Sequence, residues 1–487
     1  MNLLACIRLI TALAVAKAYI MVASLAGLRA STLPGALALR IYPGIIGHLS
    51  KQLPNISLVT GTNGKTTTNN MITGILKSAG YRVISNHEGA NLATGIATAL
   101  IKASSITGRT KGNIACLEVD EAAFPSMAKT LKPDQVVITN FFKDQLDRYG
   151  DVSTTVKRIW KALQELDEMP LLILNADDPL VANMGNENRE SVYFGLELQE
   201  TLADSGEHSV EGRLCPQCGS ELDYTSYNYS QLGVYQCSSC GFKRPMPEIF
   251  ADVYRSDVYS DGNQGVYMDI YSNQGKGGIE ENFNLALPSG GVYNAYNALA
   301  AFTLGKVLNI GGTVIKNAIE KHGPISGRME MFIYRDRTIY LNLVKNPTGF
   351  NESLKTFANS ADHKGLLIAL NDNAADGKDI SWIWDVNFEM LEMSRGDTSF
   401  VCFTGSRAEE MALRFKYAGL HFKNSVIQKN CSQAVENLIS GTQAVVYIYT
   451  SYTALWSIRN TLTKLGAKEQ SHAENSTPLS RTSKSIQ

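Results

Sequence analysis

The chain has 487 residues, of which 44 % are hydrophobic and 19 % charged, so it is an ordinary globular protein with room for about three domains. Its formal net charge of −1 argues against a nucleic-acid binder that works through bulk positive charge. Four of its eight cysteines are clustered and four are scattered. This is not a disulfide framework, and we expect a cytosolic protein.

The first 50 residues are dominated by an apolar segment. Residues 10–28 are mostly small and hydrophobic, with Lys17 as the single charged residue, and Arg8 and Arg29 flank them. We expect an N-terminal helical region, 1–50, whose helix packs on the protein or lies at an interface. Insertion into a membrane is the alternative.

A phosphate-binding loop is predicted next. The β-branched run 56–60 is followed by Gly61, Thr62, Asn63, Gly64, Lys65, Thr66 and Thr67, and then by a helix-like segment that ends near Gly80. Strand, glycine loop and helix aim backbone N–H groups at a polyphosphate, with Lys65 on the terminal phosphates and the Thr66 hydroxyl on Mg²⁺. The loop is shorter than the usual eight-residue pattern, because an apolar residue of the run 56–60 stands where the first glycine would fall. The alternative is a tight strand–helix turn with an exposed lysine.

Apolar strand-like runs then alternate with helix-length segments up to about residue 195. The runs are 56–60, 81–85, 114–119, 135–139 and 171–174. This alternation predicts an α/β fold with a largely parallel sheet wrapped by helices.

Carboxylates follow two of these runs. Glu118, Asp120 and Glu121 end the third run, at the sheet edge where such folds bind ligands. Glu118 is the first choice for a Mg²⁺ ligand, with the other two as close alternatives, and solvated acids are the competing interpretation. Asp144 and Asp147 could face the same crevice.

A polar, tyrosine-rich segment at 205–248 carries four of the cysteines. Cys215, Cys218, Cys237 and Cys240 form two CxxC pairs, each followed by a glycine that permits the turn. This spacing predicts a zinc ribbon. Because sulfur fills all four positions, the zinc should be structural; a redox-active pair is the alternative.

A helix is expected at 294–308, and then a second alternating block with strand-like runs at 338–343, 366–369, 399–403 and 444–449. We therefore expect an ATP-binding domain at 51–330 that contains the insert, and a smaller Rossmann-like α/β domain at 331–466. The polar residues 467–487 predict a disordered tail.

The ordered motifs resemble the Mur ligase superfamily over about residues 50–350. They are Gly61–Thr67, 139–147, 175–179, 294–301 and 327–330. Those enzymes phosphorylate a carboxylate with ATP and let an amine attack the acyl phosphate. The resemblance implies phosphate and Mg²⁺ contacts for Lys65, Thr66 and Glu118. It also implies a nucleotide site near Asn140, Asn294 and Asn297, and Arg328 on the γ-phosphate.

Three departures from the superfamily's sequence pattern narrow the choice of enzyme within it. Only about 55 residues precede the strand-like run that leads into the loop, too few for the UDP-binding domain of typical muramyl ligases. Gln145 replaces a histidine of the superfamily, and Asn342 replaces an acidic residue in the last domain. The amino-acid-binding machinery is therefore not expected to be the standard one.

The zinc insert, with segments 86–91, 371–379 and 381–385, is similar to the MurT-type synthetase subunits of lipid II isoglutaminyl synthase. That resemblance implies amidation of the D-glutamate α-carboxylate of lipid II at the inner face of the cytoplasmic membrane. Ammonia would come from a glutaminase partner of the GatD type, and Asp379 would orient the partner's catalytic histidine. A solvated loop acid is the alternative for Asp379.

The scattered cysteines agree with an external ammonia source. Cys116 and Cys402 sit in apolar runs, and neither Cys6 nor Cys431 has the setting of a nucleophile activated by histidine. Two rival functions remain. One is a free-standing ligase resembling folylpolyglutamate synthase, which should lack the zinc insert; the other is a nucleotide-regulated scaffold.

Overall fold

The computed structural model describes residues 3–26, 30–86, 90–143, 151–185, 190–198, 212–255, 266–274, 278–287, 291–321, 329–373, 375–394, 396–422, 424–441 and 444–469. The chain divides into two compact units. Met1–Phe141, Val152–Val258 and Gly262–His322 form the first, and Phe142–Asp151, Tyr259–Asp261 and Gly323–Gln487 form the second.

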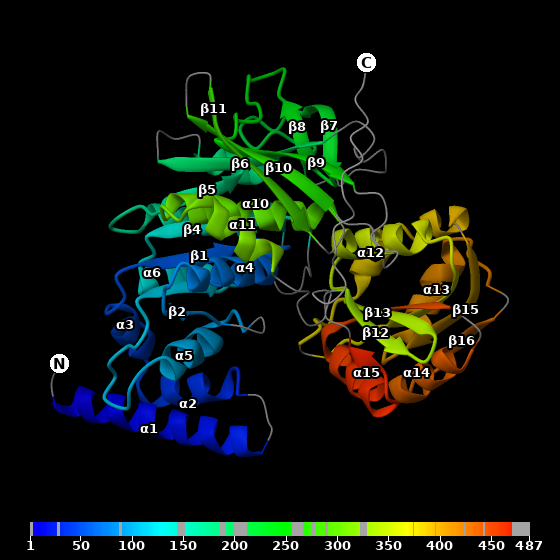
Figure 1. Ribbon diagram of the computed structural model, residues 1–487, viewed down its shortest axis with the longest axis horizontal. Coiled ribbons are helices and arrows are strands. Elements are labelled where there is room, and N and C mark those ends of the chain that lie inside the picture. The colour runs from blue at the N-terminus through cyan, green and yellow to red at the C-terminus, as the bar shows by residue number, and fades with distance from the viewer. Residues whose placement is uncertain are drawn as a thin grey trace. The chain divides into compact units, whose positions relative to one another are not determined.

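Within the described residues, the first unit is built on a nine-stranded sheet (Figure 1). Its spatial order is β11 (Gly278–Leu287), β10 (Val266–Gln274), β9 (Ile249–Arg255), β6 (Ser191–Leu198), β5 (Leu171–Asn175), β4 (Gln135–Ile138), β1 (Ile56–Thr60), β3 (Ile114–Glu118) and β2 (Val83–Ile84). The strands from β9 to β2 are parallel, and β10 and β11 add an antiparallel edge. The predicted parallel sheet is confirmed. Its central strands are continuous apolar runs because both faces are buried.

Besides the one-turn helix that follows β5, six described helices share a core with one face of this sheet. They are α1 (Leu3–Leu25), α2 (Leu33–Ile41), α3 (Ile45–Ser50), α5 (Ala93–Lys102), α6 (Phe124–Leu131) and α8 (Val152–Gln164). Ile56 and Leu58 of β1 point into this core, while Cys116 of β3 points to the other face and contacts Asn69. That other face is covered by α4 (Lys65–Ser78), α10 (Val292–Val307) and α11 (Gly312–Glu320), which lie together across the strands (Figure 1).

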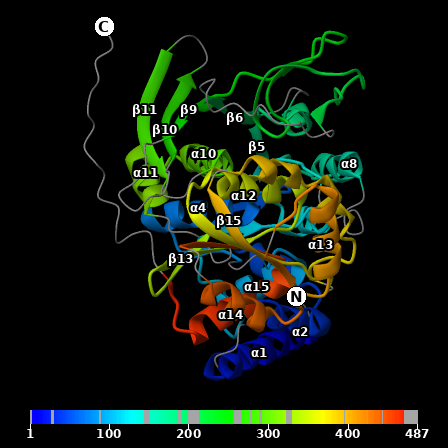
Figure 2. The ribbon, with the colours of Figure 1, turned by 90° about the vertical axis from the view of Figure 1, so that its right-hand side faces the viewer.

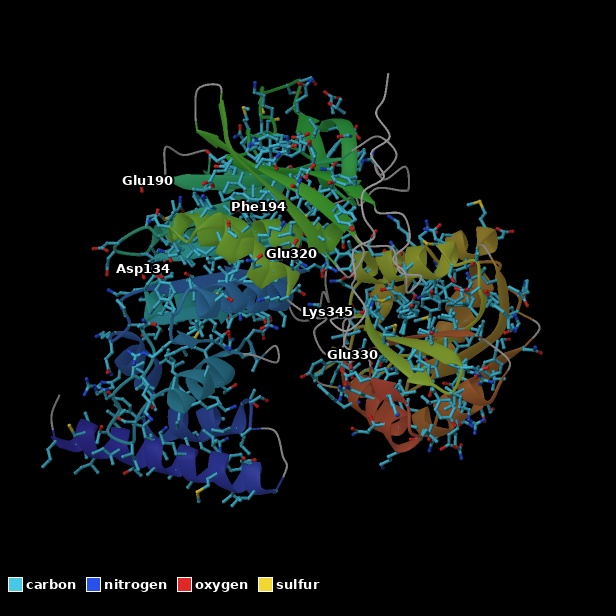
Figure 3. All side chains as sticks on the ribbon, viewed as in Figure 1. Asp134, Glu190, Phe194, Glu320, Glu330 and Lys345 are labelled. Carbon is cyan, nitrogen blue, oxygen red and sulfur yellow. The ribbon has the colours of Figure 1, made fainter. Side chains whose placement is uncertain are left out.

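Side chains at the strand ends fix the register of this sheet. Asp134, which precedes β4 (Figure 3), accepts a hydrogen bond of 2.8 Å from the backbone N–H of Ile56. Asp178 caps the short helix α9 (Pro179–Ala182) by accepting from Leu180 and Val181. It also accepts from the N–H of Phe141, which joins the ends of β4 and β5.

The second unit is a three-layer α/β domain. Its described strands lie in the order β16 (Ser425–Ile427), β15 (Asp397–Thr404), β14 (His363–Ala369), β17 (Val445–Thr450), β13 (Arg337–Leu343), β12 (Glu330–Tyr334) and β18 (Lys468–Glu469). The strands from β16 to β13 are parallel, whereas β12 and β18 are antiparallel. The predicted second block of strands is therefore present as one sheet.

Helices cover both faces of this second sheet (Figure 2). On one face, α12 (Pro347–Asn359), α13 (Ala408–Tyr417) and the 3₁₀ segments η5 (Ser381–Asp385) and η6 (Phe388–Met393) pack on an aromatic core around Phe350 and Phe415. On the other face, α14 (Cys431–Ser440) and α15 (Tyr452–Lys464) pack on smaller aliphatic residues. Glu330 at the start of β12 (Figure 3) is buried and pairs with Arg459 at 2.7 Å. Residues 470–487, most of the predicted tail, lie outside the described residues.

Candidate phosphate, metal and partner sites

The glycine loop lies between β1 and α4, as predicted. Gly61 and Gly64 have φ of 121° and 85°, in the left-handed region that favours glycine. Both also have close neighbours. A Cβ on Gly61 would lie 2.4 Å from the Thr139 hydroxyl, and a Cβ on Gly64 would lie 2.0 Å from Asn297 Oδ1. No other residue type fits these two positions without displacing a neighbour.

Asn140 and the start of α10 hold this loop. The Asn140 side chain accepts from the N–H of Asn63 at 2.9 Å and donates to the Asn63 carbonyl at 3.1 Å, while its own carbonyl accepts from Thr62. Asn297 accepts a weak hydrogen bond of 3.4 Å from Thr68 and donates one to Asn294. The three asparagines predicted near the nucleotide therefore gather at the loop, where Asn140 serves to shape the loop backbone.

Lys65 is buried at the first turn of α4. Its Nζ donates to the carbonyls of Gly61 and Thr62 and lies 3.0 Å from Glu121 Oε2. Burial alone would lower the pKa of Lys65, but the charges of Glu121, Glu118 and Asp120 outweigh it and raise the pKa. The lysine is therefore a fixed positive charge beside the loop.

Thr66 and Glu118 form the pair that fits a magnesium ion. Since β1 and β3 are neighbours with Val59 opposite Glu118, the Glu118 side chain reaches the first turn of α4. The Thr66 hydroxyl donates to Glu118 Oε2 at 2.8 Å. A hydroxyl and a carboxylate are hard oxygen ligands of the kind that Mg²⁺ binds. The other two acids have different contacts: Glu121 pairs with Lys65, and Asp120 accepts from Ala122 N.

Two residues beside this pair belong to segment 86–91, which the sequence analysis used for the resemblance without giving either residue a role. Asn91 donates to Glu118 Oε1 at 2.9 Å, which orients the carboxylate toward Thr66. Asn86 exchanges two hydrogen bonds with the backbone of Glu118, at 2.7 and 2.8 Å. Both asparagines follow β2 at the carboxyl edge of the sheet, the one sequence signal that could have indicated them.

The four cysteines form a compact cluster. Their sulfur atoms all lie within 4.8 Å of one another, with separations of 3.6 Å for Cys215–Cys240 and 3.5 Å for Cys218–Cys237. A tetrahedral zinc site with Zn–S bonds of about 2.3 Å places its sulfurs about 3.8 Å apart, so these residues fit zinc. Gly219 and Gly241 both have left-handed φ and close the two knuckles by donating to the carbonyls of Cys215 and Cys237. Hydrogen bonds from Ser220 lower the pKa of Cys218 to about 6, which favours the thiolate.

The cysteine module is attached to the rest of the first unit by a buried polar network. Arg244, just after the second knuckle, donates to Asp177 at 2.7 Å, and Asp177 also accepts from Tyr296 of α10 at 2.6 Å. Asn228 of β7 (Asp223–Tyr229) donates to Asp177, and Tyr235 of β8 (Leu232–Gln236) donates to Ala176 O. The module is therefore packed against the same helix that carries Asn294 and Asn297.

Asp379 lies in the second unit, just before η5. It is half-buried and accepts from Ser381 N at 2.8 Å. Hydrogen bonds from Ser381 hold the pKa of this carboxyl below its usual value, so it is ionised at neutral pH. The carboxylate is therefore a negative charge held at the start of η5. Asn342 is buried and bonds to Met329 N and Ser353.

Some predicted residues lie outside the described part of the chain. These are Arg328, Asp144, Gln145 and Asp147. The first part of the insert, residues 205–211, lies outside it as well.

Family models and solved structures identify this fold. A Mur ligase middle-domain model matches residues 59–237. The chain is similar in structure to a pseudomurein peptide ligase type C from Methanothermus fervidus, with a TM-score of 0.63, 24 % identity and coverage of 84 % of this chain and 79 % of that one. It is also similar to MurF from Acinetobacter baumannii, with a TM-score of 0.61, 15 % identity and coverage of 88 % and 80 %. The fold is that of the Mur ligases.

Sequence relatives narrow the identification. A MurT ligase C-terminal model matches residues 343–455. The MurT subunit of lipid II isoglutaminyl synthase (glutamine-hydrolyzing) from Staphylococcus aureus is 38 % identical over 80 % of this chain and 84 % of its own length. The Streptococcus pneumoniae subunit is 35 % identical over 89 % and 92 %. The chain belongs to the MurT family and is a ligase of peptidoglycan synthesis.

Proposed function

We propose that this chain is the ATP-consuming synthetase subunit that converts the D-glutamate α-carboxylate of lipid II to the carboxamide of D-isoglutamine. The observation that carries the proposal is the pairing of Thr66 with Glu118 at 2.8 Å beside the buried Lys65. A glycine loop, a lysine and a hydroxyl–carboxylate pair at one strand–helix junction are the groups that hold a nucleoside triphosphate and its Mg²⁺. The MurT relatives support the choice of substrate.

The reaction needs two displacements. A substrate carboxylate oxygen attacks the γ-phosphorus of ATP and ADP leaves. Ammonia then attacks the acyl carbon, phosphate leaves, and the nitrogen loses a proton to give the amide. In the first step Lys65 and the loop N–H groups offset the charge on the phosphates, with Arg328 assigned to the same task. A Mg²⁺ held by Thr66 and Glu118 would supply further charge neutralisation.

Ammonia must come from another polypeptide under this proposal. Burial raises the pKa of Cys116, and it raises that of Cys402 to about 11, so neither thiol is suited to attack glutamine. Cys215, Cys218, Cys237 and Cys240 belong to the zinc-type cluster. A glutaminase subunit of the GatD type supplies the missing activity, and Asp379 is the residue we assign to its histidine.

Reconstitution tests the synthetase activity. The chain, a glutaminase subunit, lipid II and glutamine should release ADP and yield amidated lipid II by mass spectrometry. Glu118→Gln and Thr66→Ala should each lower the rate at least about a hundredfold, because each removes a metal ligand. Glu165→Gln, at an exposed position after α8, is the matched control and should be unaffected. Wild-type rates in both site variants would refute the assignment.

The nitrogen source tests Asp379 separately. Asp379→Asn should lose glutamine-driven amidation and keep the activity measured with added ammonium, because only the partner's reaction needs this carboxylate. Asp336→Asn makes the same change at an exposed hairpin position of the second unit and should keep both activities. Equal losses with glutamine and ammonium would remove Asp379 from the proposed role.

A further inference from the structure

The outer face of helix α1 is the most unusual surface in the described part of the chain. It consists of large apolar residues that are exposed to solvent, namely Leu3, Leu4, Ile7, Ile10, Val15, Met21, Val22 and Leu25. Their exposed fractions reach 79 % at Leu3, 62 % at Met21 and 83 % at Leu25. Soluble proteins rarely leave a continuous apolar patch of this kind uncovered, so we expect another molecule or a lipid surface to cover it.

These residues form one stripe. At 3.6 residues per turn they fall within an arc of roughly 140°, which also contains Thr11, Ala14 and Ala18 but no charged residue. The inward side of α1 carries smaller residues, with Ala12, Ala16 and Ala23 buried beside Leu9 and Leu13. Most of the large hydrophobic residues of α1 therefore face outward, whereas an ordinary surface helix buries them. In Figure 1, α1 lies at the margin of the first unit, below α2 and α5.

Charge is segregated around this stripe. Residues 1–117 contain eleven lysines and arginines and one acidic residue, Glu88, so the rest of the chain has a net charge of −11. The α1–α2–α3–α5 layer and the turn after α5 expose basic side chains, namely Arg8, Arg40, Lys51, Lys102, Arg109 and Lys111. An apolar stripe in a layer of bases without acids matches an anionic lipid surface, where each basic group contributes attraction.

We infer that the outer face of α1 docks the protein on an anionic bilayer, with the helix lying in the plane of the interface. At ~1.5 Å per residue the stripe is about 34 Å long, enough to bury a row of side chains among the lipids. The inference deepens the proposed function. It rests on that function in one respect only: docking would bring the candidate site to a lipid-linked substrate.

The internal contacts of α1 argue for lying on the membrane rather than crossing it. By length and composition alone the helix could span a bilayer. Its inner side, however, belongs to the core of the first unit. The Lys17 ammonium donates to the carbonyls of Ile101 and Ser104, at the end of α5, at 2.9 and 2.7 Å. Spanning would break both bonds, expose that core and place Lys17 near the bilayer centre.

Vesicle flotation of the full chain, alone and with its glutaminase subunit, tests the inference. The protein should float with vesicles of phosphatidylcholine and phosphatidylglycerol, bind pure phosphatidylcholine more weakly, and be released by alkaline carbonate. Met21→Glu should weaken binding about tenfold or more, because it places a charge where a hydrophobic side chain would be buried. Met246→Glu changes an even more exposed methionine of the same unit and should bind as wild type.

Several outcomes would overturn the inference that α1 docks on a bilayer. These are failure of the wild type to float, equal binding by the two variants, or resistance to carbonate, which would indicate a spanning helix. Loss of flotation when the glutaminase subunit is added would assign the face to that partner. A wild-type dimer that Met21→Glu converts to a monomer, without vesicle binding, would assign it to a second copy.

A second readout separates this inference from the proposed function. Met21→Glu should keep wild-type ADP release with a water-soluble, lipid-free muropeptide and lose rate with substrate embedded in vesicles. Vesicle binding by a wild-type complex that amidates neither substrate would leave the docking surface standing and refute the function. Equal activity of Met21→Glu on both substrates would refute the docking.

Discussion

Gly64→Ala probes the phosphate loop at its most constrained point. Gly64 precedes α4 with φ of 85°, and the added methyl group would lie 2.0 Å from Asn297 Oδ1. Two costs follow. A left-handed alanine costs about 1–2 kcal/mol. Rotating Asn297 away gives up its weak hydrogen bonds with Thr68 and Asn294, worth about 1 kcal/mol together.

We therefore expect Gly64→Ala to lower the free energy of unfolding by about 2–3 kcal/mol. The same methyl group intrudes on the loop that the phosphates need, so ATP affinity should fall at least about tenfold. Urea unfolding and calorimetric titration with ATP measure the two effects. Since the strain is confined to the loop, folded protein will still be present in the binding assay.

Gly74→Ala is the matched control on the same helix. A Cβ at Gly74 meets no atom within 4 Å and its φ is not in the left-handed region. This substitution should stabilise the protein by about 0.5–1 kcal/mol and leave ATP binding unchanged. If Gly64→Ala bound ATP as tightly as Gly74→Ala does, the loop would not be the phosphate site.

Three further predictions concern a buried ion pair, the cysteine cluster and a buried carboxyl group. Arg244→Met should destabilise the protein by about 3–5 kcal/mol in urea unfolding, because it leaves the fully buried Asp177 carboxylate without its cation. Arg213→Met breaks an exposed ion pair and should cost under about 1 kcal/mol. Similar losses of stability in the two variants would contradict this account. Cys218→Ser should lower both the zinc content and the melting temperature, whereas Cys6→Ser should change neither; an unchanged melting temperature in a zinc-free variant would count against a structural metal. Burial raises the pKa of Asp178 to about 7, above its ordinary 3.8, so the folded state retains this proton and stability should fall as pH rises from about 4 to about 7. Asp178→Asn keeps the helix cap and should flatten that slope, and superimposable pH profiles would exclude the shift.

Much of the fold could be predicted because its signals are local. The strands β1, β3, β4 and β5 are continuous apolar runs, and the observed bounds agree with the predicted ones to within one residue. The cysteine module could be predicted equally well from the sequence, since each of its two knuckles needs only a short cysteine spacing and a glycine with left-handed φ. The pairing order of the strands could not be predicted, because it depends on contacts between distant segments, such as those of Ser57 with Cys116 and Gln135.

The site was only partly predictable. Glu118, Asp120 and Glu121 are chemically alike and lie within four positions, so the sequence alone left the metal ligand open. The register between β1 and β3 separates them, since it sets Glu118 against Thr66 and leaves Glu121 to Lys65. Asn86 and Asn91 act on Glu118 across a different strand, and no local pattern marks that contact.

By itself, the sequence determined the chemical groups of this protein and their order along the chain: a glycine loop between a strand and a helix, four clustered thiols, and an apolar N-terminal segment. Backbone propensity and residue spacing are enough for these. Only the tertiary structure decided which of those groups meet, and which side of α1 is buried. Those outcomes depend on how strands pair and on which small residues allow close packing, and both are properties of the folded chain.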